Sequence, residues 1–191
     1  MKNKFRPLCT AVLFATALVA APFAGAASGK EAAKQHDEPR MQQNLMKEVR
    51  HQLVLLPYYS VFDNLAYKIK GDKVTLEGQV VRPTLKSDAE AAVKSIEGVA
   101  TVVNNIEVLP VSPMDYQLRR AVYRAIYGDA GLFRYSVAAV PSIHIIVKNG
   151  NVTLEGAADT ESDKNLAGLR ANGVPNVFFV KNNLVVPGKS K

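Results

Sequence analysis

The sequence predicts an α+β protein made of two tandem modules, each with two helices packed on one face of a three-stranded mixed sheet. Three recurrences support this fold class. Val-Thr-Leu-Glu-Gly occurs at 74–78 and again at 152–156, Gly-Val at 98–99 and 173–174, and Asn-Asn before hydrophobic residues at 104–108 and 182–186. Because the matches keep the same order, they indicate one duplicated unit with the order α-β-β-α-β.

The first module is placed at residues 41–110. Leu45, Val49 and Leu53 share one face of a helix, and Pro57 ends it. Alternating polar and apolar residues on both sides of a Gly-Asp turn indicate a hairpin. The expected elements are a helix over 42–56, strands over 65–70 and 74–80, a helix capped by Thr84 or Ser87 and running to about Ile96, and a strand over 99–108.

The second module is placed at residues 111–187. Leu118, Val122 and Ile126 repeat the helical stripe, and Asn149-Gly150 is a strong hairpin turn because both residues accept positive φ. The crossover helix implies one parallel strand pairing in each sheet. The expected elements are a helix over 115–127, strands ending at Lys148 and at Gly156, a helix over 162–171, and a final strand ending at Val186.

A set of glycine and asparagine residues in the repeated pattern is expected to define the fold rather than any chemistry. These residues are Gly71, Gly78, Gly98, Asn105, Gly150, Gly156, Gly173 and Asn183.

The N-terminus is typical of a secretory signal peptide over residues 1–26. Basic residues precede an apolar run, and Ala24-Gly25-Ala26 fits a cleavage site. Residues 27–40 are polar and are expected to form a flexible leader, and 188–191 a short tail. Export to the periplasm is therefore predicted. Cys9, the single cysteine, would leave with the signal peptide, so no disulfide framework is expected.

Sequence motifs for catalysis, metal binding or cofactor binding are not found, and we expect no enzyme activity, metal or cofactor. His51 and His144 are expected at the surface without a role, because neither has a partner at ligand spacing. Without the signal peptide the chain has 21 basic and 17 acidic residues, or +4. This small excess, together with export, argues against a nucleic acid partner.

The helix expected over 115–127 carries an aromatic and basic outer face. We predict this face as a candidate lipid-binding site, because tyrosine favours the headgroup zone and arginine pairs with phosphate. The alternative is that its tyrosines pack against the first module or the long loop. The residues are Tyr116, Arg119, Arg120, Tyr123, Arg124 and Tyr127.

The repeated pattern resembles the BON domain (bacterial OsmY and nodulation). The first copy resembles it through Gly71, Val74, Leu76, Gly78 and Gly98-Val99, and the second through Val152, Leu154, Gly156, Gly173-Val174 and Asn182-Asn183. The resemblance implies a non-enzymatic periplasmic envelope protein that binds anionic phospholipid headgroups or supports envelope integrity under stress. A protein-binding or chaperone-like module of an envelope complex is the alternative function, with an envelope protein as its partner.

Overall fold

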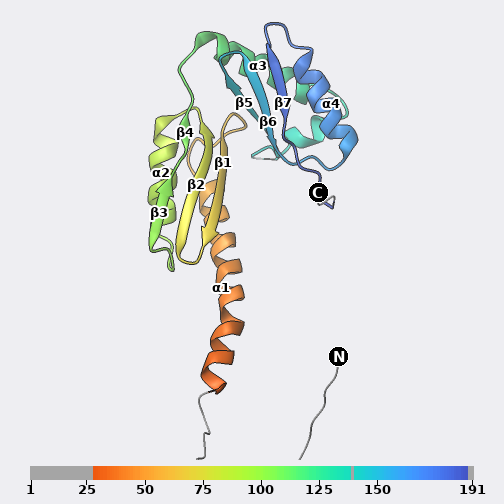
Figure 1. Cartoon of the computed structure of the whole chain (residues 1–191). Helices are drawn as coiled ribbons and strands as arrows, with labels where there is room; N and C mark the ends of the chain where they lie inside the picture. Colours follow the sequence, from red (N-terminus) through yellow and green to blue (C-terminus); the bar gives the residue numbers. More distant parts are fainter. Residues whose placement is uncertain (1–27, 139, 189–191) are drawn as a thin grey trace, which may run out of the picture.

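The computed structural model describes residues 28–138 and 140–188, so the expected signal peptide lies outside the described residues. The expected α+β fold with two modules and mixed sheets is confirmed, and the two modules lie side by side (Figure 1). The helices are α1 (Ser28–Val54), α2 (Pro83–Lys94), α3 (Pro113–Tyr127) and α4 (Glu161–Asn172), with a 3-10 turn at Phe133–Ser136. The strands are β1 (Asn64–Lys70), β2 (Lys73–Val80), β3 (Thr101–Asn104), β4 (Glu107–Val108), β5 (Ile143–Lys148), β6 (Asn151–Gly156) and β7 (Phe179–Asn182).

The two sheets have the same arrangement around their central strand, but the first has four strands rather than the expected three, because the strand expected over 99–108 is divided into β3 and β4. In the first, β2 pairs with β1 antiparallel and with β3 and β4 parallel. In the second, β6 pairs with β5 antiparallel and with β7 parallel. The helices of each module bury one apolar face against the sheet, which gives two separate cores. The parallel pairing follows from the helix that connects the second and third strands of each module.

Helix α1 is longer than the sequence pattern indicates. It begins at Ser28 rather than near Gln42 and includes most of the segment expected to be a flexible leader. Ala, Lys, Glu and Gln in this segment are good helix formers, which a search for an apolar stripe does not register. The N-terminal half of α1 extends away from both sheets (Figure 1).

Helix α2 has its N-cap two residues before Thr84 and five before Ser87, the two caps that the sequence suggests. Its N-cap residue is Arg82 and Pro83 occupies the first turn, so neither Thr84 nor Ser87 is the cap. Pro83 fits this position because it has no backbone N–H to leave unpaired.

In each module the first residue of the Asn-Asn pair ties the third strand to a helix, and in the second module Asn183 also donates to the Glu155 carboxylate of β6. Asn104 donates to the Lys86 carbonyl of α2 and accepts from the Ile106 N–H. In the second module, Asn182 donates to the Lys164 carbonyl of α4 in the same way. Asn105, which was expected to define the fold, has an exposed side chain. The side chain that faces the helix therefore holds strand and helix together.

Two of the expected fold-defining glycines lie where backbone segments approach closely. Gly78 has φ +121°, and a Cβ on it would lie 2.1 Å from the Asn64 carbonyl oxygen. Gly156 has φ +104°, and its Cβ would lie 2.1 Å from the Ser142 carbonyl oxygen. Any side chain at either position would push the paired strand away.

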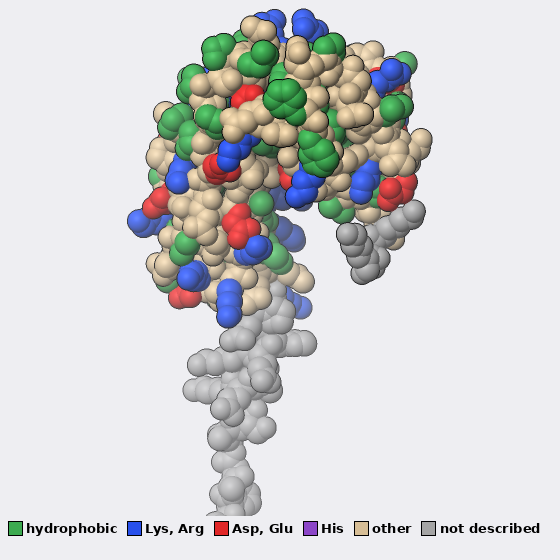
Figure 2. Space-filling view, turned by 45° about the horizontal axis from the view of Figure 1, so that its top comes forward, with side chains coloured by type: hydrophobic (Ala, Val, Ile, Leu, Met, Phe, Trp, Pro, Cys, Tyr) green, Lys and Arg blue, Asp and Glu red, His purple; other side chains and the backbone are tan. Residues whose placement is uncertain are grey.

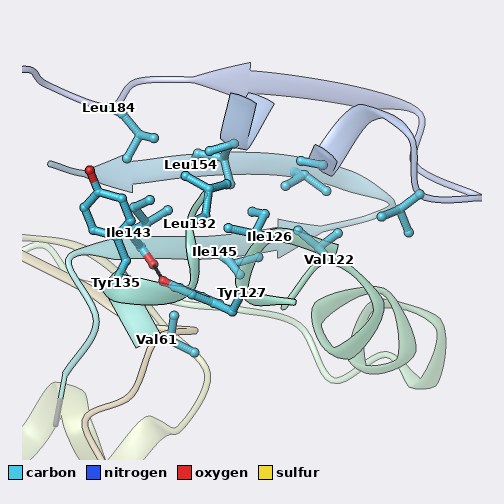
Figure 3. Packing of buried hydrophobic residues seen from close by; sticks show 14 of the residues in the cluster. Val61, Val122, Ile126, Tyr127, Leu132, Tyr135, Ile143, Ile145, Leu154 and Leu184 are labelled. Atoms are coloured by element: carbon cyan, nitrogen blue, oxygen red, sulfur yellow. Dashed lines mark hydrogen bonds between the residues drawn. The ribbon is translucent and has the colours of Figure 1, made fainter. Parts of the chain in front are cut away.

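The modules are joined by the loop between α1 and β1, residues 57–63, which runs beside β5. The Val61 carbonyl accepts the Ile145 N–H at 2.8 Å, and the Val61 side chain is part of the second core. Figure 3 shows Val61 beside Tyr127 at the edge of that core. Asp63 is 1% exposed and holds this loop by accepting from the Ser60 hydroxyl and the Val81 N–H. One module thus supplies part of the core of the other.

The buried position of His144 corrects the expectation of a surface histidine. Its ring is 5.7 Å from the Tyr59 ring and the residue is 9% exposed. Burial lowers the pKa of His144, and this effect outweighs the opposing effect of the Asp63 and Ser60 backbones and of the Asp63 and Glu155 charges. The sequence alternation does not show this burial, because the covering loop comes from the other module.

We predict that Gly78→Ala destabilises the first module far more than Gly71→Ala. Both glycines have positive φ, but a Cβ on Gly71 meets nothing within 4 Å. Gly71→Ala should therefore cost about 1 kcal/mol of unfolding free energy, and Gly78→Ala should add a backbone clash of about 2 kcal/mol or more. Urea unfolding followed by circular dichroism measures both, and equal costs would contradict the close approach.

We predict that the free energy of unfolding decreases as the pH is lowered from 7.5 to 5. The folded state keeps His144 neutral, so the unfolded state binds more protons once the pH falls below the ordinary histidine pKa of about 6.5. The loss is at most about 1.4 kcal/mol for each pH unit. Thermal melts of the wild type and of His144→Gln measure it, and the variant should lose less. An identical pH dependence in both would contradict the burial of His144.

Candidate functional site

A shallow groove follows the outer face of α3 and has a volume of about 440 Å³. One wall is α3 and the other is the segment 174–176 between α4 and β7. We call it the α3 groove. Its side chains include an exposed tyrosine, two arginines and a methionine: Tyr116, Arg120, Arg124 and Met114.

Helical spacing determines which side chains of α3 line the groove. Leu118, Val122 and Ile126 are buried in the second core. Tyr116, Arg120 and Arg124 follow one another at intervals of four residues, so they form one stripe on the opposite side. The sequence prediction is therefore correct in placing these three residues on an outer face.

The N-terminal end of α3 is held firmly. The Ser112 hydroxyl accepts the Asp115 N–H at 3.2 Å as an N-cap. The Asp115 carboxylate is 1% exposed and accepts the N–H groups of Asn149 and Gly150, each at 2.9 Å. Asp115 thus ties the start of the helix to the turn between β5 and β6. The α3 wall of the groove is therefore a helix fixed at its N-terminal end.

The charge of the α3 groove is positive. Among the described residues, neither Arg120 nor Arg124 forms an ion pair with a carboxylate. The Arg120 guanidinium lies 5.8 Å from the centre of the Tyr116 ring. Two exposed guanidinium groups one turn apart can donate several hydrogen bonds to an anionic group. On the face that Figure 2 shows, hydrophobic and basic side chains intermix over the upper part of the molecule.

Arg119 and Tyr127 do not belong to this outer face, which corrects the sequence prediction. Both are 4% exposed. Arg119 Nη2 donates to the Val147 carbonyl at 2.9 Å, and the Tyr127 hydroxyl donates to the Ile143 carbonyl. Burial lowers the pKa of Arg119 and raises the pKa of Tyr127. These side chains close the outer edge of β5 instead of facing solvent.

Tyr123 supports the alternative of packing between modules. It is half-buried, and its ring lies 6.1 Å from the Phe62 ring and 4.8 Å from the Tyr127 ring. Phe62 belongs to the loop of the first module. The expected six-residue face is therefore divided: three residues line the α3 groove and three face the interior or the other module.

Within the described residues, no three His, Cys, Asp or Glu side chains gather in a way that could hold a metal ion. The described helices also include none with the length and apolar character needed to cross a membrane.

Among solved structures, the chain is similar to two of CdsD, a structural protein of the type III secretion system of Chlamydia trachomatis. The first is 14% identical in sequence, and the match covers 75% of this chain and 92% of that chain with a TM-score of 0.29. The second, the C-terminal domain of CdsD, is 15% identical, covering 74% and 96% with a TM-score of 0.27. No curated protein matches the chain.

The sequence profile of the BON domain matches residues 48–110 and again 116–188. Each match falls on one of the two modules, and together they span more than half of the chain. The protein therefore belongs to the BON domain family and carries two copies of the domain.

Proposed function

We propose that this protein is a non-enzymatic periplasmic envelope protein that binds anionic phospholipid surfaces through the α3 groove. The observation that supports this most is the pair of exposed arginines, Arg120 and Arg124, which have no carboxylate partner among the described residues. Their guanidinium groups suit the phosphates of lipid headgroups. The resemblance to BON domains and the predicted signal peptide support the same function.

The apolar side chains around the groove suit the boundary between headgroups and acyl chains. Tyr116 is 57% and Met114 54% exposed, and Val111, just before α3, is fully exposed. A tyrosine ring is favourable at this depth of a bilayer because one end is apolar and the other can remain hydrated. Binding by so few groups is expected to be weak and reversible.

We predict that Arg120→Gln with Arg124→Gln weakens binding to phosphatidylglycerol vesicles. A basic residue near an anionic surface contributes about 1 kcal/mol, so removing two should lower the partition constant roughly 30-fold at low salt. Co-sedimentation of the protein, from residue 27, with phosphatidylglycerol and with phosphatidylcholine vesicles measures this. Added salt should weaken wild-type binding.

The matched control is Lys47→Gln with Lys94→Gln, which removes the same charge from exposed positions on α1 and α2. It should bind vesicles within about threefold of the wild type, because only the general charge changes. If both double variants bind equally well, the α3 groove is not the lipid site. If the wild type binds neither vesicle, the proposed function is wrong.

A further inference from the structure

The outer edge of β1 is a free sheet edge, because β1 pairs only with β2. The Leu76 carbonyl of β2 accepts the Asn105 N–H on the β3 side, so the backbone N–H and C=O of Leu76 point away from β1. Its partner in the antiparallel register is Tyr67. Residue pairs in an antiparallel ladder alternate between hydrogen-bonded and non-hydrogen-bonded, and Tyr67 and Leu76 form a non-hydrogen-bonded pair. The backbone N–H and C=O of Tyr67 therefore point outward from the sheet, and so do those of Ile69, two residues further along.

The equivalent strand of the second module, β5, has its outer edge closed. Arg119 donates to the Val147 carbonyl, Tyr127 donates to the Ile143 carbonyl, and the Val61 carbonyl accepts the Ile145 N–H. The protein therefore fills this edge with its own groups.

The first module lacks the residues that close the edge. The repeat aligns Leu45, Val49 and Leu53 of α1 with Leu118, Val122 and Ile126 of α3, which places Met46 at the position of Arg119 and Val54 at that of Tyr127. Neither side chain can donate a hydrogen bond, and they are 44% and 46% exposed.

Most of the β1 edge remains open. At the Leu65 end of β1, the Tyr59 hydroxyl lies near the strand backbone. Among the described residues, the backbone groups of Tyr67 and Ile69 that point outward have no hydrogen-bond partner. An open edge of this kind is a template for a further strand.

A cleft of about 470 Å³ borders this edge. Its walls come from α1, from β1 and from the start of β5 in the second module. Leu53, Val54 and Pro141 make part of it apolar, and Arg50 adds a positive charge. A strand added to β1 would point alternate side chains into this cleft, on the same face as Tyr67 and Ile69.

The other face of β1 carries the exposed Lys68 and Lys70. Lys68 forms an ion pair with Glu77 of β2, whereas Lys70 forms none among the described residues. Pairing of β1 with its counterpart in a second copy would bring these lysines close together, which is unfavourable. A strand with acidic residues on that face would instead be attracted. The edge thus selects against self-association and for an acidic partner.

We propose that the open edge of β1 and the adjoining cleft bind an extended peptide segment of a partner protein in which acidic and apolar residues alternate. Its acidic residues lie beside Lys68 and Lys70, and its apolar residues enter the cleft. The segment adds a strand to the first sheet through the backbone groups of Tyr67 and Ile69.

The first test uses an end-blocked peptide of about eight alternating Glu and Val residues, with a Lys-Val peptide as the control. Amide hydrogen exchange of the isotope-labelled protein is followed by NMR. The Glu-Val peptide should slow exchange at Tyr67 and Ile69 at least about tenfold, and salt should weaken this effect. The Lys-Val peptide should change neither amide. Protection by both peptides, by neither, or only at residues of the α3 groove would overturn the proposal.

The second test uses variants. Ile69→Pro removes an outward N–H, which an edge strand tolerates, and should abolish peptide binding while vesicle binding persists. Lys68→Glu with Lys70→Glu should weaken binding at least about tenfold, whereas the control Lys94→Glu with Lys181→Glu, at exposed positions of α2 and β7, should stay within twofold. Should Ile69→Pro fail to fold, the charge reversals decide. Unchanged affinity in the double variant at Lys68 and Lys70 would refute the acidic partner.

Discussion

The hydrogen bond between the Ile145 N–H and the Val61 carbonyl marks the contact on which the arrangement of this protein depends. A module of this size buries only a small core and is marginally stable alone. The loop of residues 57–63 adds Val61 to the second core and covers the face of β5 that carries His144. Asp63 fixes the loop, and an ion pair between Glu107 and Lys148 adds a contact between the modules. The two domains therefore form one structural unit.

Duplication has left the two modules with different free surfaces. In the second module, Arg119 and Tyr127 close the edge of β5, and the outer stripe of α3 presents Arg120 and Arg124. In the first module, Met46 and Val54 stand where the edge-closing residues would be, and the edge of β1 stays open. One fold thus offers a helix face in one copy and a sheet edge in the other. The partners proposed for these two surfaces differ accordingly: a lipid surface for the helix face and an extended peptide for the sheet edge.

Sequence periodicity predicts the fold of each module because helices and half-buried strands are shaped by local packing. The stripe at Leu118, Val122 and Ile126 and the hairpin turns follow from spacing and residue type. The extension of α1 has no apolar stripe and rests on helix propensity alone, so the pattern does not mark it. Asn104 and Asn105 look equivalent in sequence, and only the strand register decides which one faces the helix.

The candidate site is half predictable for a similar reason. Periodicity places Tyr116, Arg120 and Arg124 on the face opposite the core, and the structure agrees. It does not show what packs on the flanks of that face. Tyr123, Tyr127 and His144 are covered by a loop from the other module, and loops carry no periodic signal. Arg119 is charged, yet it is buried because the edge of β5 requires a donor.

The most direct test of this account is native-state hydrogen exchange of the free protein at single-residue resolution. The Ile145 amide should be strongly protected, since the Val61 carbonyl accepts its hydrogen, and the Tyr67 and Ile69 amides should exchange much faster, since they point outward from an open edge. Strong protection of Tyr67 and Ile69 would contradict the open edge at β1, and rapid exchange of Ile145 would contradict the joining of the modules at β5.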